Sequence, residues 1–325
     1  MKENINNRFY LGLDTSAYTT SLALVNGQEE LIADRRLPLK VRKGSIGLRQ
    51  SEAVFAHLAN LPLLWQEGGG PPSEGQIKAV AFSDRPRPEK NSYMPVFKVG
   101  EASALLIAQT NGLAAFRSTH QEGHIMAGLW SAGLAGGHYL VFHLSGGTTE
   151  ILSVSEEKPG SLYLEFLGGS ADLQAGQFID RLGRDFGFPF PAGPSLEKVA
   201  CSGEEDKIRL PVSVSGLSIS FSGPASHAQR IWKKGCRIED LALAIEICIA
   251  DSLATVVQNI PGGAKAYSAA LAVGGVAGNL FIRQRLQKKL PSWQIFFAAP
   301  EYASDNAVGL AVQAARLDGY GSRSS

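Results

Sequence analysis

The chain has 325 residues, of which 44% are hydrophobic and 19% are charged, and its 31 Lys and Arg nearly balance its 30 Asp and Glu. This length is enough to bury the core of one large domain or of two ordinary ones. With a formal net charge of only +1, the overall charge does not indicate a nucleic-acid or membrane partner. Any basic surface must therefore be local.

The sequence also gives an expectation for the compartment. Cys201, Cys236 and Cys248 are odd in number and lack C-x-x-C spacing, which indicates a reducing compartment and predicts small core residues rather than disulfides. Residues 1–8 are polar, and the sequence has no apolar run of 18 residues. We therefore expect no signal peptide, no membrane span and a cytoplasmic location.

The first half opens with short apolar runs over 9–14, 21–25 and 31–33, which predict a β-meander. Asn26-Gly27 indicates a hairpin turn, because both residues tolerate positive φ. A helix is expected after Ser51 as its N-cap, with Pro62 kinking or ending it; its predicted apolar face comprises Val54, Phe55, Leu58 and Leu61. A strand over 78–82 and a helix over 101–110, closed by Asn111-Gly112, complete this half.

The second half repeats this opening. A strand is expected over 139–144, a tight turn over 145–149, and returning strands over 150–154 and 162–167. The elements expected after them are helices over 174–186 and 238–258, a strand over 269–273, a basic helix, a strand over 294–298, and a final helix over 306–317 with Gly319 just beyond it. This alternation predicts an α/β fold of two related lobes, whose interlobe cleft is the default ligand site.

Three turns of small residues each follow an apolar strand, at 14–16 (DTS), 145–149 (SGGTT) and 274–279 (GGVAGN). Glycines let backbone N–H groups approach an anion and hydroxyls add donors, so such turns suit phosphate binding. Any one of them alone is more often a tight connection of an α/β protein. Together they favour a bound nucleotide, and the absence of GxxxxGK[ST] excludes a P-loop.

The segment His120-Gln121-Glu122-Gly123-His124 places two imidazoles about 40° apart on one face of a predicted helix, where they can share a metal ion. The zinc-protease pattern HExxH is excluded, because Gln121 stands where its glutamate must be and Glu122 points away. A third ligand is needed, and Asp305 near the start of the last helix is the candidate. The alternatives are two surface histidines on a helix that Gly123 weakens, and Ser304 or Asp305 as an ordinary N-cap.

His143 interrupts an apolar strand two residues before Ser145. Strand alternation places both side chains on one face. His143 is therefore either a hydrogen-bonded core histidine or a further ligand that faces the same cleft.

Taken in order, these motifs resemble the universal tRNA threonylcarbamoyladenosine synthase family, in particular its transferase subunit, formerly named O-sialoglycoprotein endopeptidase. LGLDTSAYTTSLAL resembles the family's opening GIETSCDET, STHQEGH its HxxxH, and FHLSGGTTE its VSGGHT turn. AGQFIDRLGRDFGFPFPAGPSLEKVA resembles AGEAFDKxAxxLGLxYPGGPxIEKLA, SISFSGPAS resembles FSFSGLKT, AVGGVAGN resembles VAGGVAAN, and ASDNA resembles TDNA. The likeness covers nearly the whole chain and implies the actin, sugar-kinase and heat-shock-ATPase fold. We expect one lobe of residues 1–128 with 303–325, and a second of 129–302.

The resemblance implies that His120, His124 and Asp305 bind a divalent metal, iron or zinc. His143 occupies the place of an extra tyrosine ligand of archaeal and eukaryotic members. It also implies a site for an adenylate, threonylcarbamoyl-AMP, or for ATP. The residues implied are Ser145, Gly146 and Gly147 at the phosphate, Asp180, Gly193 and Glu197 at the ribose, and Gly275 and Asn279 near the adenine.

The implied reaction is metal-dependent transfer of threonylcarbamoyl from threonylcarbamoyl-AMP to the N6 amine of adenosine 37 in tRNA. The implied partners are tRNA, a paralogous protein and a small P-loop ATPase, as in bacterial members. Contact with tRNA would rest on local basic residues. The candidates are Lys40, Arg42, Lys43, Arg85, Arg87 and Lys90.

Four segments depart from the family pattern. They are Tyr18 and Thr19 where the family has acids, Asp84 to Pro88 in place of a glycine-rich GPGL, Gln177 in place of the glutamate of AGE, and Pro224-Ala225 in place of the leucine and lysine of SGLK. They raise a second hypothesis, a divergent non-catalytic nucleotide-binding paralogue that serves as partner or scaffold in a modification complex. A small-molecule kinase on the same fold is a third, although no substrate motif supports it.

Overall fold

The structure is a computed structural model that describes residues 7–16, 18–40, 48–70, 72, 75–89 and 91–321. Of the predicted tRNA contacts, Arg42, Lys43 and Lys90 lie outside the described residues. The chain divides into two compact units, the first from 1–136, 156–163 and 304–325, and the second from 137–155 and 164–303.

The centre of the first unit is a five-stranded sheet of order β3-β2-β1-β4-β5. Its strands are β1 (Arg8–Thr15), β2 (Thr19–Asn26), β3 (Leu31–Pro38), β4 (Gln76–Ser83) and β5 (Ala114–Ser118). The first three pair antiparallel, β4 lies parallel to β1, and β5 lies parallel to β4. The predicted meander is therefore confirmed, whereas β5 escapes the sequence analysis.

The turn between β2 and β3 differs from the expected one. Glu29, not Asn26 or Gly27, adopts the left-handed conformation, with a φ of 62°. The Asn26 side chain stabilises the loop instead, because its Oδ1 accepts the N–H groups of Gln28 and Glu30, each at 2.9 Å. A side-chain turn of this kind satisfies the backbone without a two-residue hairpin.

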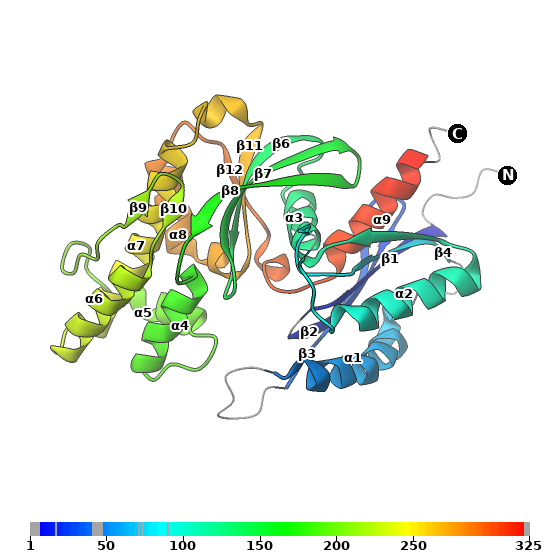
Figure 1. The fold of residues 1–325 in the computed structure, drawn as a ribbon, viewed down its shortest axis with the longest axis horizontal. Coiled ribbons are helices and arrows are strands. Elements are labelled where there is room, and N and C mark those ends of the chain that lie inside the picture. Colours follow the sequence, from blue (N-terminus) through cyan, green and yellow to red (C-terminus); the bar gives the residue numbers. More distant parts are fainter. Residues whose placement is uncertain are drawn as a thin grey trace. The chain divides into compact units, whose positions relative to one another are not determined.

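The described part of the first unit also contains the helices α1 (Gln50–Leu64), α2 (Phe97–Asn111), α3 (His120–Ser131) and α9 (Val308–Gly321). α1 and α2 lie on the face of the sheet opposite α9, and α3 packs along α9 (Figure 1). Gly112 closes α2 with a φ of 64°, as predicted, whereas α9 runs through Gly319 instead of ending before it. A five-residue π-helical segment, Trp65–Gly69, follows α1.

Half of the predicted apolar face of α1 is confirmed, because Val54 and Leu61 are partly buried and pack against core clusters. Phe55 is 73% exposed and Leu58 is also exposed, whereas Ala53, His57 and Leu64 are the buried residues of this helix. Arg49 rather than Ser51 is the N-cap residue, and Pro62 lies inside the helix. The periodicity of the large apolar residues misleads here, because hydrogen bonds allow a histidine to occupy the buried face.

The second unit is built on a seven-stranded sheet of order β12-β11-β6-β7-β8-β10-β9. Its strands are β6 (Gly137–Leu144), β7 (Thr149–Lys158), β8 (Ser161–Ser170), β9 (Val214–Ser215), β10 (Ser218–Ile219), β11 (Ala269–Val273) and β12 (Ile295–Phe297). β6 lies parallel to β11 and β11 parallel to β12, so the order β8-β7-β6-β11-β12 repeats β3-β2-β1-β4-β5 of the other sheet. The repeat confirms that the two halves are related.

Helices cover this second sheet and supply most of its core. They are α4 (Ala175–Asp185), α5 (Gly193–Ala200), α6 (Ser222–Lys233), α7 (Ile238–Gln258) and α8 (Leu280–Lys289), with short 3-10 turns at Gly263–Ala266, Gly275–Gly278 and Pro300–Tyr302. α7 is the most deeply buried of them, and Cys248 on it is buried. Cys201 is exposed and Cys236 is partly exposed, so the expectation of three core cysteines holds only for Cys248. Among the described residues, no helix combines the length and the apolar character that a bilayer span requires.

Candidate metal and nucleotide sites

The start of α3 fixes the spacing of the histidine pair. Thr119 and Glu122 form a capping box, in which the Thr119 hydroxyl accepts the Glu122 N–H and the Glu122 carboxylate accepts the Thr119 N–H at 2.8 Å. Because the cap ends at Thr119, His120 opens the helix and His124 lies one turn further on. The carbonyls of Arg85 and Pro86 accept the N–H groups of His120 and Gln121, so the segment that departs from the family pattern supports this helix start.

Two glycines, Gly123 of α3 and Gly309 of α9, bring the start of α9 close to α3. A Cβ on Gly309 would lie only 1.9 Å from the carbonyl oxygen of Gly123, so the two backbones cross at a distance that excludes any side chain at position 309. Gly123, which weakens the helix as a sequence feature, is thus part of a close helix crossing. Asn306, not Ser304 or Asp305, accepts the Val308 N–H at 3.0 Å, so Asp305 is not an N-cap of α9.

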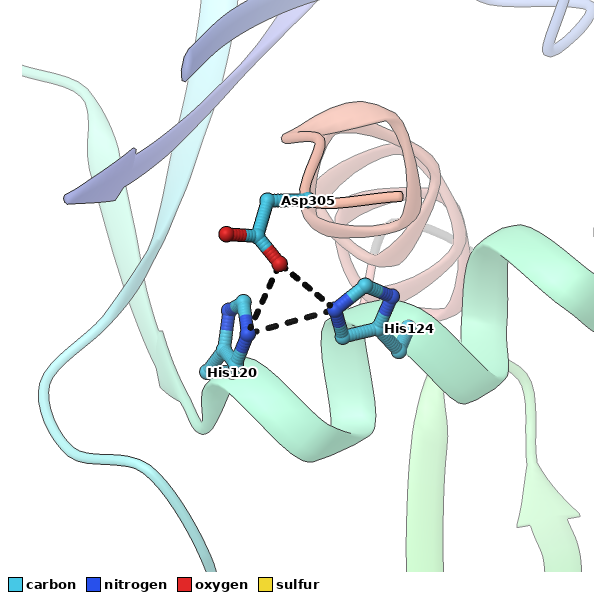
Figure 2. A group of neighbouring side chains, drawn as sticks. All are labelled: His120, His124 and Asp305. Atoms are coloured by element: carbon cyan, nitrogen blue, oxygen red, sulfur yellow. Dashed lines mark hydrogen bonds and ion pairs between the residues drawn. The ribbon is translucent and has the colours of Figure 1, made fainter. Parts of the chain in front are cut away.

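His120, His124 and Asp305 converge on one point (Figure 2). The His120 and His124 Nε2 atoms are 3.2 Å apart, and Asp305 Oδ1 lies 3.6 Å from the first and 3.4 Å from the second. The circle through these three atoms has a radius of about 2.0 Å, which matches the metal–nitrogen and metal–oxygen distances of zinc and similar ions. Two imidazoles and one carboxylate on one face are also a donor set that iron and zinc accept.

Further side chains hold these three groups in place. Asp14, at the end of β1 and 1% exposed, accepts from the Nδ1 of His120, with its oxygens at 3.1 and 3.2 Å. Ser83 donates to the same carboxylate at 2.5 Å, and the Ser16 hydroxyl donates to Asp305 Oδ2 at 3.0 Å. A carboxylate behind a histidine fixes its tautomer, so that Nε2 presents its lone pair toward the shared point. The residues at 14–16 are predicted from the sequence to form a phosphate-binding turn, whereas Asp14 and Ser16 lie behind the histidine–aspartate group in the structure.

The electrostatics of the group favour a cation. Burial opposes a charge on His120, but the carboxylates of Asp14 and Asp305 outweigh it and raise the pKa of His120 well above its ordinary value. Burial likewise disfavours charge on Asp305, yet its hydrogen bonds and charge interactions with His120 and His124 hold the pKa of Asp305 well below its usual range. A position where two carboxylates, the buried Asp14 and the partly exposed Asp305, retain a proton on a histidine is one where a positive ion is stabilised.

His143 belongs to the second unit. It lies in β6 in register with Val273 of β11, and it is buried. Its role as a further ligand stays a prediction.

In the second unit, the turn of Ser145, Gly146 and Gly147 follows β6 and rests on the start of α4. The carbonyl oxygen of Ser145 accepts the N–H of Gly176, and a Cβ on Gly176 would lie 2.6 Å from the Cα of Gly146. Gly146 and Gly147 are exposed, with open space where a Cβ would be. The turn therefore offers free space for an anion beside a rigid support. Gln177 closes a capping box with Gln174, which is the structural role of this departure from the family pattern.

Of the residues expected at the ribose, Asp180 and Glu197 each accept a hydrogen bond from a backbone N–H group. The Asp180 carboxylate accepts the N–H of Ala192, directly before Gly193, at 2.8 Å, and burial raises the pKa of Asp180. The Glu197 carboxylate accepts the N–H of Leu280 at 2.7 Å. Glu197 is thus brought next to Asn279, whereas no hydrogen bond between described residues joins Asp180 to Glu197.

Asn279 is the N-cap of α8, and Gly275 lies in the 3-10 turn before it. The Asn279 Oδ1 accepts the Ile282 N–H at 2.8 Å, and its Nδ2 donates to Glu246 Oε1 at 2.6 Å. Both ends of this amide are therefore engaged within the protein. Glu246, which the sequence analysis missed, is buried, and burial raises its pKa to about 8. The one feature of the sequence that could have indicated Glu246 is an acidic residue among the apolar residues of a predicted helix.

The chain is similar to proteins whose names all refer to threonylcarbamoyladenosine in tRNA. The family described as tRNA N6-adenosine threonylcarbamoyltransferase matches residues 76–312. A protein of that name from Archaeoglobus fulgidus is 28% identical over 306 residues, which cover 93% of this chain and 88% of that protein. A protein from Methanothermobacter thermautotrophicus named "Probable bifunctional tRNA threonylcarbamoyladenosine biosynthesis protein" is 29% identical over 308 residues, and the chain spans 54% of its length.

Solved structures share the fold at low sequence identity. An activator of 2-hydroxyisocaproyl-CoA dehydratase from Clostridium difficile has a TM-score of 0.55 at 13% identity, covering 98% of each chain. Full-length HypF in its phosphate- and nucleotide-bound form has a TM-score of 0.59 at 12% identity, covering 98% of this chain and 56% of that one. The expected actin-like and sugar-kinase-like α/β fold is confirmed.

Proposed function

Because the chain belongs to the tRNA N6-adenosine threonylcarbamoyltransferase family, we propose that it transfers threonylcarbamoyl from threonylcarbamoyl-AMP to the N6 amine of adenosine 37 in tRNA. The observation that carries this proposal is the convergence of His120, His124 and Asp305 on one point. The bonds exchanged are simple: the amine attacks the carbamoyl carbonyl carbon, AMP departs with the electrons of the broken bond, and the amine loses one proton. No nucleophilic side chain is required.

His120, His124 and Asp305 would hold a divalent ion, iron or zinc. When bound, such an ion supplies Lewis-acid polarisation of the carbonyl. Asp14 keeps His120 in the tautomer that presents Nε2, and Ser16 holds the outer oxygen of Asp305 so that Oδ1 is available. His143 is the proposed fourth ligand.

The second unit would hold the adenylate. Backbone groups of Ser145, Gly146 and Gly147 would receive the phosphate, and Asp180, Gly193 and Glu197 the ribose. Since both ends of the Asn279 amide are engaged, we assign Asn279 the task of holding the turn that carries Gly275 next to the adenine. ATP is the alternative ligand of the same residues.

The tRNA would meet basic side chains of the first unit in the cytoplasm. Lys40, Arg85 and Arg87 are the candidates among the described residues, and Arg85 is also within 3.7 Å of Asp84. By analogy with bacterial members, a paralogous protein and a small P-loop ATPase would assist. Tyr18, which is half exposed where the family has an acid, leaves deprotonation of the amine to another group or to water.

A reconstituted reaction tests the proposal. The purified chain is loaded with Fe²⁺ or Zn²⁺ and incubated with threonylcarbamoyl-AMP and unmodified tRNA, with and without the two partner proteins. Mass spectrometry of digested tRNA should detect modified adenosine. H120A/H124A should abolish it, whereas the matched variant H138A, which removes a histidine of the second unit, should not.

Failure of every such mixture to modify tRNA would reject the transferase and favour the non-catalytic partner. That alternative predicts that H120A/H124A keeps every activity of the wild type, including any stimulation of a catalytic partner. A sugar- or acid-dependent ATP turnover would instead favour the kinase hypothesis.

A further inference from the structure

His57 is a buried histidine on α1 that the proposed reaction does not use. It is 0% exposed, and both of its ring nitrogens are hydrogen-bonded. Nδ1 lies 2.8 Å from the Thr20 hydroxyl on β2, and Nε2 lies 2.8 Å from the carbonyl oxygen of Ser16. The histidine therefore links α1 to the chain directly after β1.

The partners determine the direction of these hydrogen bonds. A carbonyl oxygen only accepts, so His57 Nε2 carries the proton and donates to Ser16. Asn60 donates to the Thr20 oxygen at 3.0 Å, and the Thr20 hydroxyl is free to donate to His57 Nδ1. Burial lowers the pKa of His57, which agrees with a neutral ring that has one donor and one acceptor.

Ser16, whose carbonyl accepts from His57, also contacts the group of His120, His124 and Asp305. Its hydroxyl donates to Asp305 Oδ2 at 3.0 Å, while Asp305 Oδ1 is the oxygen that faces His120 and His124. The hydrogen bonds from Asn60 through Thr20 and His57 thus end at the Ser16 backbone carbonyl, and a separate bond leads from the Ser16 hydroxyl to the carboxylate. Because His57 holds the Ser16 backbone, it fixes the position from which the Ser16 hydroxyl donates to Asp305.

We propose that His57 is a positioning residue of the metal centre, which fixes the Ser16 backbone so that its hydroxyl keeps Asp305 with one oxygen toward the ion. This inference rests on the metal site of the proposed function. It assigns a role to the buried face of α1, and it predicts that metal affinity depends on a residue that touches no ligand.

The test measures the binding of Co²⁺ to the full-length chain stripped of metal, by titration and by the visible spectrum that reports the ligand geometry. H57L removes both hydrogen bonds and should weaken Co²⁺ binding about tenfold, the lower end of the effect of outer-layer residues on metal affinity. H57Q keeps an N–H donor for Ser16 and should restore affinity to within about threefold of the wild type. T20V removes only the support of Nδ1, nearly preserves the shape of the core, and should lose about threefold.

H138L is the matched control, because His138 also has both ring nitrogens hydrogen-bonded, to Ala266 and Ser153 of the second unit. Its Co²⁺ affinity and spectrum should equal those of the wild type. Unchanged affinity and spectrum in T20V, or in a folded H57L, would overturn the proposal, and so would equal losses in H57L and H138L.

The two proposals fail separately. If wild-type protein binds no Co²⁺, or if H120A/H124A binds it as well as the wild type does, the proposed metal site is wrong. If wild-type protein binds Co²⁺ through the histidines but the His57 variants do not differ from it, only the positioning role is wrong. Co²⁺ binding with the expected His57 effects but without any tRNA modification would retain this inference and reject the transferase.

Discussion

Replacing Gly309 by alanine should move Asp305 away from His120 and His124, the other two residues of the candidate metal site. The new Cβ would lie 1.9 Å from the carbonyl oxygen of Gly123, and an ordinary contact begins near 3.4 Å, so the crossing of α3 and α9 must open by about 1.5 Å. Asp305 lies just before α9, and its Oδ1 is now 3.4 and 3.6 Å from the two histidine nitrogens. The same shift applied there would increase these distances to about 5 Å, whereas two ligands of one ion with bonds of about 2.1 Å cannot be more than about 4.2 Å apart.

We therefore expect G309A to reduce metal affinity by at least about a hundredfold. Overpacking at the crossing should also lower the free energy of unfolding of the metal-free protein by about 1–3 kcal/mol. Isothermal titration with Zn²⁺ measures the first effect, and urea unfolding of metal-free protein measures the second. G319A is the matched control on the same helix, because a Cβ at Gly319 meets nothing within 4 Å. It should leave Zn²⁺ affinity unchanged and stabilise the helix by about 0.5–1 kcal/mol. Wild-type Zn²⁺ affinity in a folded G309A would refute the reasoning that the crossing sets the ligand geometry.

Three further predictions concern the charged groups. D14N should lower the pKa of His120 and weaken Zn²⁺ binding about tenfold to a hundredfold in chelator competition, and an unchanged affinity would exclude Asp14 from the site. Metal affinity should decrease as the pH falls through the raised pKa of His120, since each ion must displace the proton on that histidine. In metal-free protein, the protonated His120 stabilises the fold at pH values below its unfolded pKa of about 6.5. This contribution to stability is lost as the pH rises through the raised pKa of His120 in the folded protein. Zn²⁺ titrations across the pH range check this, and a flat profile would contradict it. E246Q should increase the free energy of unfolding, with a gain that grows from about pH 4.5 to about pH 8 and reaches a few kcal/mol. In this range the buried Glu246, whose pKa is about 8, stays protonated in the folded protein, whereas it ionises in the unfolded chain and so favours unfolding. Equal unfolding curves at pH 5 and pH 8 for both proteins would contradict the raised pKa.

The sequence predicts the elements whose pattern is long and regular. Apolar residues at helical spacing predict a helix over 238–258, and α7 has these bounds. The repeated meander predicts related halves, and the two sheets share one strand order. β5 and α6 are missed because five residues with a mixed pattern, and a helix that begins with Ser-Gly-Pro, give no such signal. Local pattern is informative only where it extends over several turns or alternations.

The candidate metal ligands can be predicted from the sequence, but the residues that hold them cannot. His120 and His124 are recognisable because their spacing puts them on one helix face, and Asp305 because a third donor was needed. The roles of Asp14 and His57 behind the ligands are found only in the structure, since their partners are 106 and 41 residues away along the chain. Gly123 shows the same limit, because a residue that disfavours an isolated helix is favoured where two helices cross closely.

The buried charge of this group bears on whether the chain is a catalyst or a scaffold. Two imidazole nitrogens and a carboxylate oxygen point at one another across 3.2 to 3.6 Å, and the buried carboxylate of Asp14 lies behind them. Groups of this kind cost free energy to remove from water. Without a cation, their lone pairs repel unless one histidine holds a proton, and a scaffold gains nothing from that arrangement that a well-packed apolar cluster would not supply. An ion at the shared point satisfies all three donors at once. The geometry therefore favours the metal-dependent transferase over the non-catalytic partner, even though Tyr18 and Gln177 differ from the family pattern.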